Sequence, residues 1–401
     1  MKILKIEFEN LLHYTSPTTI DFFASKNITQ PDKDKLYRLS KTSKIYLNNV
    51  IALTGLNASG KTTLLNTILF VAKYLKNIPL NQISEKNSLR LKEGQKANFK
   101  VYFAHKEDIW LLSSEISKNS EESLFFVDET LSVYKNGINK SKAALFKPNN
   151  YQIDSSRKDI AQYLSADASM IVHFLNTYQT GLYVSDYLNF TNHNFLKLIT
   201  DFPEELLAFL DSSIEYLRFD INPKTKICDS TRLKFKNSEE LLLSSPAQLE
   251  TYLSSGTIKG LGLFVSAVIT MLNGGYLVID ELEKHFNAQI AASLIQLFYD
   301  PNVNISGGTL LFSTHYPLLL DQIDRTDCIY LLKNENLISA SRLDTILTRK
   351  DIKKSDIFIS GYLEGTAPDY LPYRNLIRAL IEKAENTNKE NQVNSDEVKN
   401  G

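Results

Sequence analysis

The eight residues from Gly55 to Thr62, GLNASGKT, restrict the fold of this chain more than any other feature. They match G-x-x-x-x-G-K-[ST], a pattern whose glycines let the backbone curl around a phosphate and point its N–H groups inward. An almost continuously apolar run, Asn49 to Thr54, precedes the motif, and a helical pattern, Thr62 to Tyr74, follows it. A buried strand, a glycine-rich turn and a helix N-terminus together predict a phosphate-binding loop in an α/β fold.

The residue types in this loop indicate separate contacts with a nucleotide. Lys61 is predicted to lie over the β- and γ-phosphates, and the hydroxyl of Thr62 to bind Mg²⁺. An incidental glycine turn is the simpler explanation of such a match, but the flanking strand and helix argue against it. The residues expected to contact the nucleotide here are Gly55, Asn57, Ala58, Ser59, Gly60, Lys61, Thr62 and Thr63.

A second apolar run ends in two acids. Tyr276 to Ile279 reads as a buried strand, and Asp280 and Glu281 follow it directly. Ligands of open α/β sheets bind at the carboxyl ends of the strands. We therefore expect Asp280 to hold Mg²⁺, directly or through water, and Glu281 to orient and polarise an attacking water. The alternative is a strand that simply ends in a solvated turn.

Two further features lie on either side of this acidic pair. Leu253 to Thr257, LSSGT, is a small-residue loop that opens a helix, and such a terminus can bind an anion through Ser254 and Gly256. His315 follows the apolar run Leu310 to Ser313, from which it can reach a γ-phosphate. Each alone also fits a helix cap or a structural histidine. What distinguishes a nucleotide site from these simpler explanations is the order of the four features along the chain: P-loop, small-residue loop, acidic strand end and histidine.

That order of motifs resembles the ABC-type ATPase head, most closely its RecF/SMC-like branch. Within the branch the chain is similar to the stand-alone OLD-like and abortive-infection ATPases of bacterial phage defence. The resemblance covers roughly residues 1–75 and 213–370. The residues that carry it outside the P-loop are Asp280 to Asn287 (DELEKHFN), Ser313 to Pro317 (STHYP) and Asp356 to Pro368 (DIFISGYLEGTAP).

The resemblance implies a mechanism with ATP and Mg²⁺ as ligands. Lys61, Glu281 and His315 would be the catalytic residues, with Thr62 and Asp280 at the metal. The loop with Ser254 and Gly256 looks like the ABC signature, which in this class contacts the nucleotide held by a second subunit. Two heads would then sandwich two ATP molecules in a homodimer or higher oligomer, and ATP would favour the closed state only through those extra contacts.

The pattern of apolar residues divides the chain into five parts. We expect an ABC-like head with a mixed sheet, flanking helices and an antiparallel β meander, interrupted by a helical insertion. The ranges are an N-terminal lobe with the P-loop at 1–154, the insertion at 155–212, a C-terminal lobe at 213–345, an extension at 346–384 and a disordered tail at 385–401.

Composition limits the ligands and the cellular compartment that we expect for this chain. The 45 Lys and Arg residues nearly balance the 46 Asp and Glu residues, so no basic field covers the whole molecule. Two distant cysteines cannot form a disulfide framework, which favours a reducing cytoplasm. The longest apolar stretch, Leu261 to Leu272, is shorter than the roughly 20 residues that span a bilayer, and we interpret it as a buried helix.

Three functions remain open on the sequence. The first is a defence ATPase that senses infection and controls a separate effector, because few residues follow Thr345 and an appended nuclease domain needs more. The second is DNA maintenance, for which Lys140, Lys142, Lys147 and the runs 349–350 and 353–354 offer local basic charge. The third, a transporter subunit, fits the meander less well.

The contacts to the base are also open. Tyr14 is the candidate for stacking on adenine, and Gln95 and Gln152 are the candidates for the Q-loop glutamine of such ATPases, although both could equally be surface residues. Neither assignment separates ATP from GTP.

Overall fold

The computed structural model describes residues 1–188, 201–225, 227–284, 287–347, 353–363, 366 and 371–384. Its central sheet has the strand order β10-β14-β15-β5-β16-β17. The strands are β10 (Val184–Tyr187), β14 (Tyr276–Ile279), β15 (Thr309–Thr314), β5 (Val50–Thr54), β16 (Ile329–Asn334) and β17 (Ile338–Arg342). All neighbours are parallel except β16 and β17. The expected mixed sheet of an α/β fold is confirmed.

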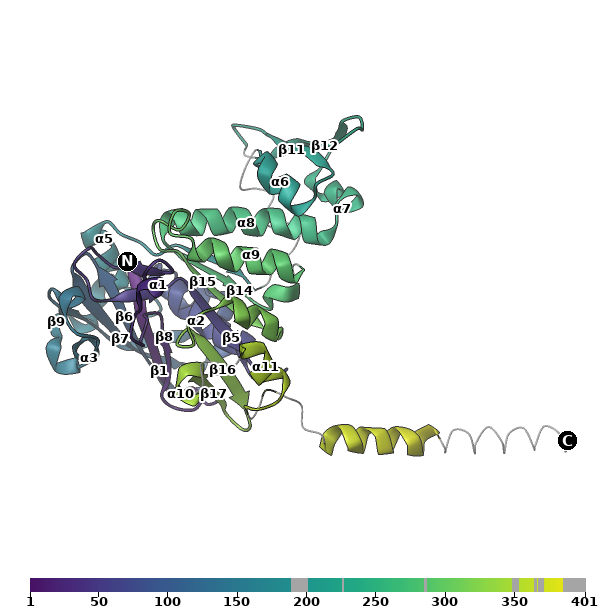
Figure 1. Ribbon diagram of the computed structural model, residues 1–401. Coiled ribbons are helices and arrows are strands. Elements are labelled where there is room, and N and C mark those ends of the chain that lie inside the picture. The colour runs from purple at the N-terminus through teal and green to yellow at the C-terminus, as the bar shows by residue number, and fades with distance from the viewer. Residues whose placement is uncertain are drawn as a thin grey trace.

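Helices cover both faces of the central sheet (Figure 1). Helix α2 (Lys61–Leu75) lies between this sheet and a second, antiparallel one, and its Phe70 and Tyr74 meet Phe99 and Phe126 of the latter. Helices α8 (Ser255–Asn273) and α9 (Ala288–Tyr299) lie on the opposite face. This layering explains why β5, β14 and β15 are buried throughout and mostly apolar.

The second sheet is the expected meander, in the order β2-β1-β6-β7-β8-β9, with every pair antiparallel. Part of β6 alternates between buried and half-buried residues, whereas Val101 to Ala104 are all buried, because a second apolar cluster that includes Tyr102 and Ala104 covers the other face there. Its strands are β1 (Lys2–Glu9), β2 (Thr18–Asp21), β6 (Lys96–His105), β7 (Asp108–Lys118), β8 (Leu124–Tyr134) and β9 (Gln152–Ser156).

The segment 155–212 differs from the helical insertion that we expected. It contains α4 (Arg157–Ile160), α5 (Ile171–Tyr178) and α6 (Glu204–Leu210), but also β10, which pairs in parallel with β14 and forms an edge of the central sheet. Phe174 of α5 packs against Phe103 and Trp110 of the meander. Much of this segment therefore completes the main core rather than forming a separate body. Residues 189–200 lie outside the described part of the chain.

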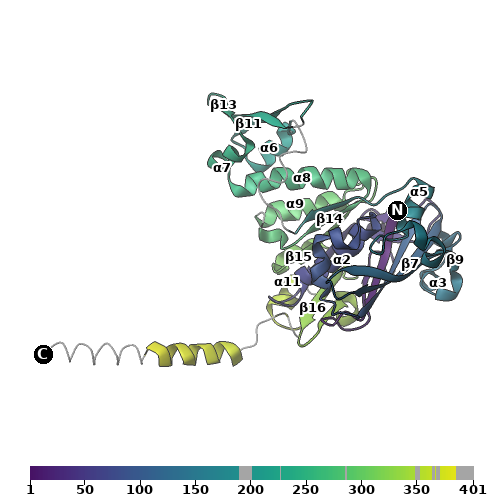
Figure 2. The ribbon, with the colours of Figure 1, turned by 180° about the vertical axis from the view of Figure 1, so that it is seen from behind.

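A small lobe stands over α8, as Figures 1 and 2 show. It consists of the antiparallel strands β11 (Ile214–Ile221), β12 (Cys228–Phe235) and β13 (Leu241–Leu243), together with α6 and α7 (Leu249–Tyr252). Leu207, Leu217, Leu233 and Leu261 belong to its own apolar cluster. Helix α6 belongs to the expected insertion at 155–212, and the strands belong to the expected C-terminal lobe at 213–345. The small lobe therefore crosses the boundary that we expected at residue 213.

Short elements connect these layers. The helical ones are α1 (Gln30–Lys33), α3 (Lys142–Leu145), α10 (Leu343–Ile346) and α11 (Lys354–Ile359), and β3 (Leu36–Arg38) pairs with β4 (Tyr46–Asn48). The 3₁₀ turns are η1 (Leu80–Gln82), η2 (Ser84–Leu89), η3 (Gly137–Asn139), η4 (Pro148–Asn150), η5 (Ala161–Tyr163), η6 (Pro246–Gln248), η7 (Leu282–Lys284) and η8 (Pro317–Gln322).

The last described segment is a helix over residues 371–384, which stands clear of the body (Figure 1). The tail 385–401, which we expected to be disordered, lies outside the described residues. Helix α8 is long and apolar enough to cross a membrane by composition, but 67% of its most apolar window is buried inside the protein. The interpretation of Leu261 to Leu272 as a buried helix is thus confirmed.

Candidate nucleotide-binding site

The P-loop joins β5 to α2 with a backbone that only certain residues allow. Gly55 and Gly60 both have positive φ, 145° and 97°. A Cβ atom on Gly55 would lie 2.4 Å from the carbonyl oxygen of Leu332, and one on Gly60 would meet Ile338 at 2.5 Å. These close approaches require glycine at both positions. Gly60 is the N-cap of α2, so the first turn of that helix opens directly onto the loop.

Lys61 lies across the loop that precedes it. Its ammonium donates to the carbonyl oxygens of Gly55 and Leu56, each at 2.9 Å. Burial lowers the pKa of Lys61 to about 8, although the negative charges of Asp280, Glu281 and Glu283 act in the opposite direction. A phosphate at this position would supply the negative charge that keeps this ammonium protonated.

Thr62 and Asp280 meet at the start of α2. The Thr62 hydroxyl donates to Oδ2 of Asp280 at 2.6 Å, while Oδ1 of Asp280 accepts a hydrogen bond from the hydroxyl of Ser313. Ser313 is fully buried and also accepts from the backbone N–H of Glu281 at 2.7 Å. One serine on β15 therefore orients both acids that follow β14.

This pair of oxygen donors fits a magnesium ion that arrives with a nucleotide. Mg²⁺ is usually held by one or two carboxylates, waters and phosphate oxygens rather than by a complete protein cage. Within the described ranges, no group of three or more His, Cys, Asp or Glu side chains could hold a metal. Thr62 and Asp280 would thus hold Mg²⁺ together with phosphate oxygens.

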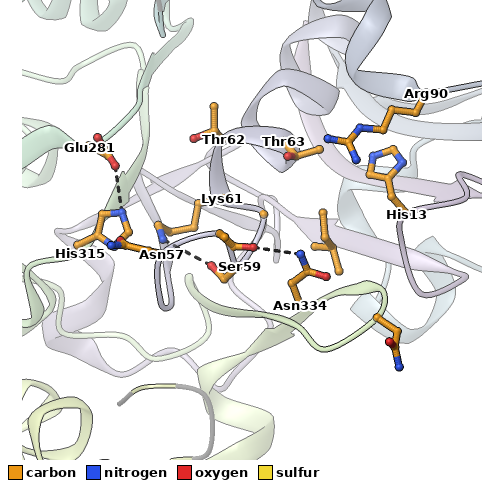
Figure 3. Close-up of a pocket in the computed structure, with 14 residues that line it drawn as sticks. His13, Asn57, Ser59, Lys61, Thr62, Thr63, Arg90, Glu281, His315 and Asn334 are labelled. Atoms are coloured by element: carbon orange, nitrogen blue, oxygen red, sulfur yellow. Dashed lines mark hydrogen bonds and ion pairs between the residues drawn. The ribbon is translucent and has the colours of Figure 1, made fainter. Parts of the chain in front are cut away.

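Glu281 and His315 face each other beside the P-loop, where Figure 3 shows their contact. Nε2 of His315 lies 3.0 Å from Oε1 of Glu281, and the ammonium of Lys284 pairs with the other oxygen. Burial alone would raise the pKa of Glu281, but Lys284 and His315 outweigh it and lower that pKa. Glu281 has a left-handed φ of 49°, a strained conformation for glutamate that often marks functional sites.

A cavity of about 630 Å³ connects these groups, with Glu281 and His315 on one side of the P-loop residues in Figure 3 and His13 and Arg90 on the other. The predicted residues that line it are Asn57, Ala58, Ser59, Gly60, Lys61, Thr62, Thr63, Glu281 and His315. Asp280 joins them through its bond to Thr62. The fold therefore places the P-loop, the acidic pair after β14 and His315, which lie up to 260 residues apart in sequence, around one cavity.

Sequence reasoning missed the side of the cavity that lies away from Glu281. His13, Arg90, Asn334, Asn336 and Ile338 line it. Both ring nitrogens of His13 are buried and have no hydrogen-bond partner among the described residues, so their capacity to donate and accept is unused. Burial and the charge of Arg90 lower the pKa of His13 to about 4, which keeps the ring neutral. No motif marks these positions, which lie in loops or at the ends of β16 and β17, remote from the P-loop in sequence.

The prediction that Tyr14 stacks on adenine is wrong in this structure. Tyr14 is only 3% exposed, its hydroxyl bonds Thr67 at 3.1 Å, and its ring packs edge-on against Phe8. The neighbouring His13 faces the cavity instead. The two glutamine candidates also lie elsewhere: the side-chain amide of Gln95 donates to the carbonyl of Asn10, and Gln152 is exposed on β9.

Ser254 and Gly256 are at the N-terminus of α8 and do not line the cavity with the P-loop. The Ser254 hydroxyl caps the helix by accepting from the backbone N–H of Thr257 at 3.0 Å. Ser254 is exposed, and Gly256 is half-buried. The loop is therefore a solvent-facing helix terminus in a single copy.

A family model described as "AAA domain, putative AbiEii toxin, Type IV TA system" matches residues 50–321, more than half of the chain. No curated protein matches the chain. The matched range begins at β5, includes the P-loop, Asp280, Glu281 and His315, and ends within η8.

Proposed function

The chain belongs to this family of AAA-domain proteins, P-loop ATPases with a toxin–antitoxin association, and from that premise we propose that it binds and hydrolyses ATP as the switch of a bacterial anti-phage defence system. The observation that carries the proposal is the convergence of Thr62, Asp280, Glu281 and His315 beside the P-loop. Phosphoryl transfer needs positioning and charge stabilisation more than covalent chemistry, and this arrangement supplies both.

Each side chain has a role in this proposal. The loop N–H groups and Lys61 bind the phosphates, while Thr62 and Asp280 hold Mg²⁺, which neutralises charge that develops on the phosphate oxygens. Glu281 accepts a hydrogen bond from the attacking water and turns it towards the γ-phosphate. Its lowered pKa keeps it ionised for that task. His315, 3.0 Å from Glu281, holds the carboxylate in place and can reach the γ-phosphate.

The nucleoside half of ATP belongs on the other side of the cavity. Glu281 and His315 mark the side where the γ-phosphate reacts, so the base and ribose extend towards His13, Arg90 and Asn334 (Figure 3). A neutral imidazole can both donate and accept a hydrogen bond. His13 therefore suits the polar edge of a base, and Arg90 suits the phosphates or the ribose.

A second copy would complete the site. Ser254 is exposed and Gly256 half-buried at a helix N-terminus outside the cavity, and such a terminus is suited to an anion. If these residues cap the nucleotide of a partner, ATP stabilises the closed dimer through contacts that only ATP offers, and hydrolysis releases them. The closed and open states then report the state of the nucleotide.

The C-terminal segment is placed to transmit this state to a separate effector. A cavity of about 420 Å³ next to the P-loop is lined by Asn57 and His315 on one side and by Phe358 of α11 on the other. Movement of His315 on hydrolysis would change the shape of this cavity, and η8, which begins at Pro317 just after His315, packs against α11. A toxin–antitoxin association of the family supports a separate partner protein.

The DNA-maintenance alternative receives no specific support. Lys142 donates to the main-chain carbonyls of Ala24 and Lys26, so its ammonium already has partners. Lys354 lies near the carboxylates of Asp321 and Asp324. Residues 349 and 350 fall outside the described chain.

A disulfide-trapping experiment tests the proposal. Copies carrying Ser254→Cys are mixed with copies carrying Asn57→Cys, all with Glu281→Gln to prevent hydrolysis and with Cys228→Ser to remove the partly exposed native thiol. We expect a cross-linked pair of chains with ATP and Mg²⁺ but not with ADP. The matched control places the cysteine at the exposed Ser213 instead of Ser254. A product that ignores the nucleotide, or no product, would refute the ATP sandwich.

A further inference from the structure

The helix over residues 371–384 presents an apolar stripe that is exposed in the described part of the chain. Leu376, Ile377, Leu380 and Ile381 are 55%, 40%, 56% and 52% exposed. Figures 1 and 2 show the helix clear of the body from both sides. Side chains this apolar rarely remain exposed together on one helix face unless that face binds something.

An apolar groove of about 540 Å³ lies on another part of the molecule, between α6, α8 and α9. Phe209 of α6 is 47% exposed there and packs edge-on against Phe264 of α8, with ring centroids 5.6 Å apart. Val268 and Leu272 continue the face of Phe264 along α8 and are also exposed. The groove therefore leads onto a wider apolar surface.

The stripe and the groove have the same helical spacing. The wall that α9 contributes runs from Gln289 to Asp300, and the stripe runs from Tyr373 to Ala384, so each is about 16 Å long at 1.5 Å per residue. The positions are 289, 292, 293, 296, 297 and 300 in the groove, and 373, 376, 377, 380, 381 and 384 in the helix. Matching three-turn faces are what helix-in-groove packing requires.

Their charges are also complementary. Among the described residues that line the groove, Glu205 and Asp300 are acidic and none is Lys or Arg. Beside its stripe the helix carries Arg374 and Arg378 on one flank and Lys383 on the other, with Glu382 as its single acid. Complementary charge around an apolar contact selects the partner and sets its orientation.

We propose that the helix 371–384 of one copy docks in the α6–α8–α9 groove of a second copy. One chain carries both halves of the contact, so two copies related by a twofold axis exchange helices and bury the contact twice. The contact involves neither the P-loop nor Ser254. It is independent of nucleotide and would hold two copies together between rounds of the ATP cycle.

Cross-linking without nucleotide tests this docking separately from the ATP sandwich. One batch carries Leu380→Cys and another Gln296→Cys, both with Cys228→Ser, while the buried Cys328 remains. We expect a disulfide between two chains after mixing. The control is Ala379→Cys, on the opposite face of the helix, which should react much more slowly. Equal reaction of the control, or no cross-link, overturns the proposal.

A single-chain version decides whose helix fills the groove. A chain with both Leu380→Cys and Gln296→Cys should cross-link mainly to other chains at micromolar concentration. A cross-linked monomer instead means that the helix folds back on its own body, and the second-copy proposal is then wrong.

Substitutions test the energetics of the same contact. Leu380→Asp should raise the dissociation constant of the nucleotide-free dimer roughly tenfold to a hundredfold, the loss expected for a buried anchor, whereas Ala379→Asp should change it little.

Reversing the charges tests the electrostatic part of the contact. Glu205→Lys with Asp300→Lys should also weaken the dimer, and Arg374→Glu with Arg378→Glu in the other copy should restore it. A nucleotide-free protein that is monomeric throughout contradicts the docking but leaves the ATP sandwich untouched.

Discussion

The hydroxyl of Thr62 donates a 2.6 Å hydrogen bond to Asp280, although 218 residues separate the two in sequence. Thr62 is in the first turn of α2 after β5, and Asp280 follows β14, with β15 between these two strands in the sheet. Ser313 on that middle strand binds the second oxygen of Asp280. The carboxyl ends of three neighbouring parallel strands thus place a hydroxyl and an oriented carboxylate where Mg²⁺ and phosphate would meet.

Asp280→Asn should remove the effect of Mg²⁺ on nucleotide affinity. The amide offers a neutral oxygen in place of the anionic ligand, so we expect ATP to bind with Mg²⁺ about as weakly as it does in excess chelator. Titrations with and without Mg²⁺ measure this. The exposed Asp154→Asn is the control and should keep the full effect of the metal. Retention of that effect in Asp280→Asn would remove Asp280 from the metal site.

ATP affinity should depend on the charge of Lys61. The pKa of Lys61 is about 8 in the nucleotide-free protein, and bound phosphate should raise it. Binding then takes up a proton, so affinity is highest below about pH 8 and falls by up to tenfold per unit as the pH rises towards the higher pKa of the complex.

Calorimetry at pH 8 to 9 in buffers of different ionisation enthalpy measures this proton uptake. The variant Lys61→Arg stays charged throughout this range, so whatever binding it retains should show no uptake assigned to this position. An uptake of the same size in Lys61→Arg would assign the proton to another group.

His13→Ala should weaken the binding of ATP but leave the binding of its phosphates to the P-loop unchanged. The ring contributes two buried nitrogens with no partner in the described part of the chain, and its loss should cost about tenfold in ATP affinity if a base or ribose bonds them. Binding of inorganic tripolyphosphate, which occupies only the P-loop, should be unchanged. Because the pKa of His13 is about 4, ATP binding should not depend on this residue's titration between pH 6 and 8. Equal losses for both ligands would place His13 outside the nucleoside subsite.

Local patterns were enough to predict the phosphate loop and the acids after β14. Each combines an apolar strand with a short functional sequence, and the environment of a buried parallel strand follows from its composition alone. The α/β fold, the meander and the buried helix α8 followed from the same periodicities. The edge strand β10 was missed, because four residues among helical patterns give too short a signal to distinguish from a turn.

The identity of the residue that faces the nucleoside could not be predicted. His13 and Tyr14 are neighbours in one loop, and an aromatic ring next to a P-loop is the more obvious partner for a base. Tertiary packing decides otherwise, since Phe8 and Thr67 enclose Tyr14 and turn His13 to the cavity. Arg90 is similar: its left-handed φ of 48° after η2 places it there, and no sequence pattern encodes that turn.

Mixing two inactive variants tests whether two copies of this chain share each ATP. Lys61→Ala loses its P-loop but keeps Ser254, whereas Ser254→Arg keeps its P-loop and blocks the capping loop. Alone, neither should hydrolyse ATP. Random pairing makes half of the dimers mixed, each with one complete site, so an equal mixture should recover roughly a quarter of the unmodified specific activity. A mixture that stays inactive, or a Ser254→Arg variant that hydrolyses ATP at the full rate, would show that each chain works on its own nucleotide.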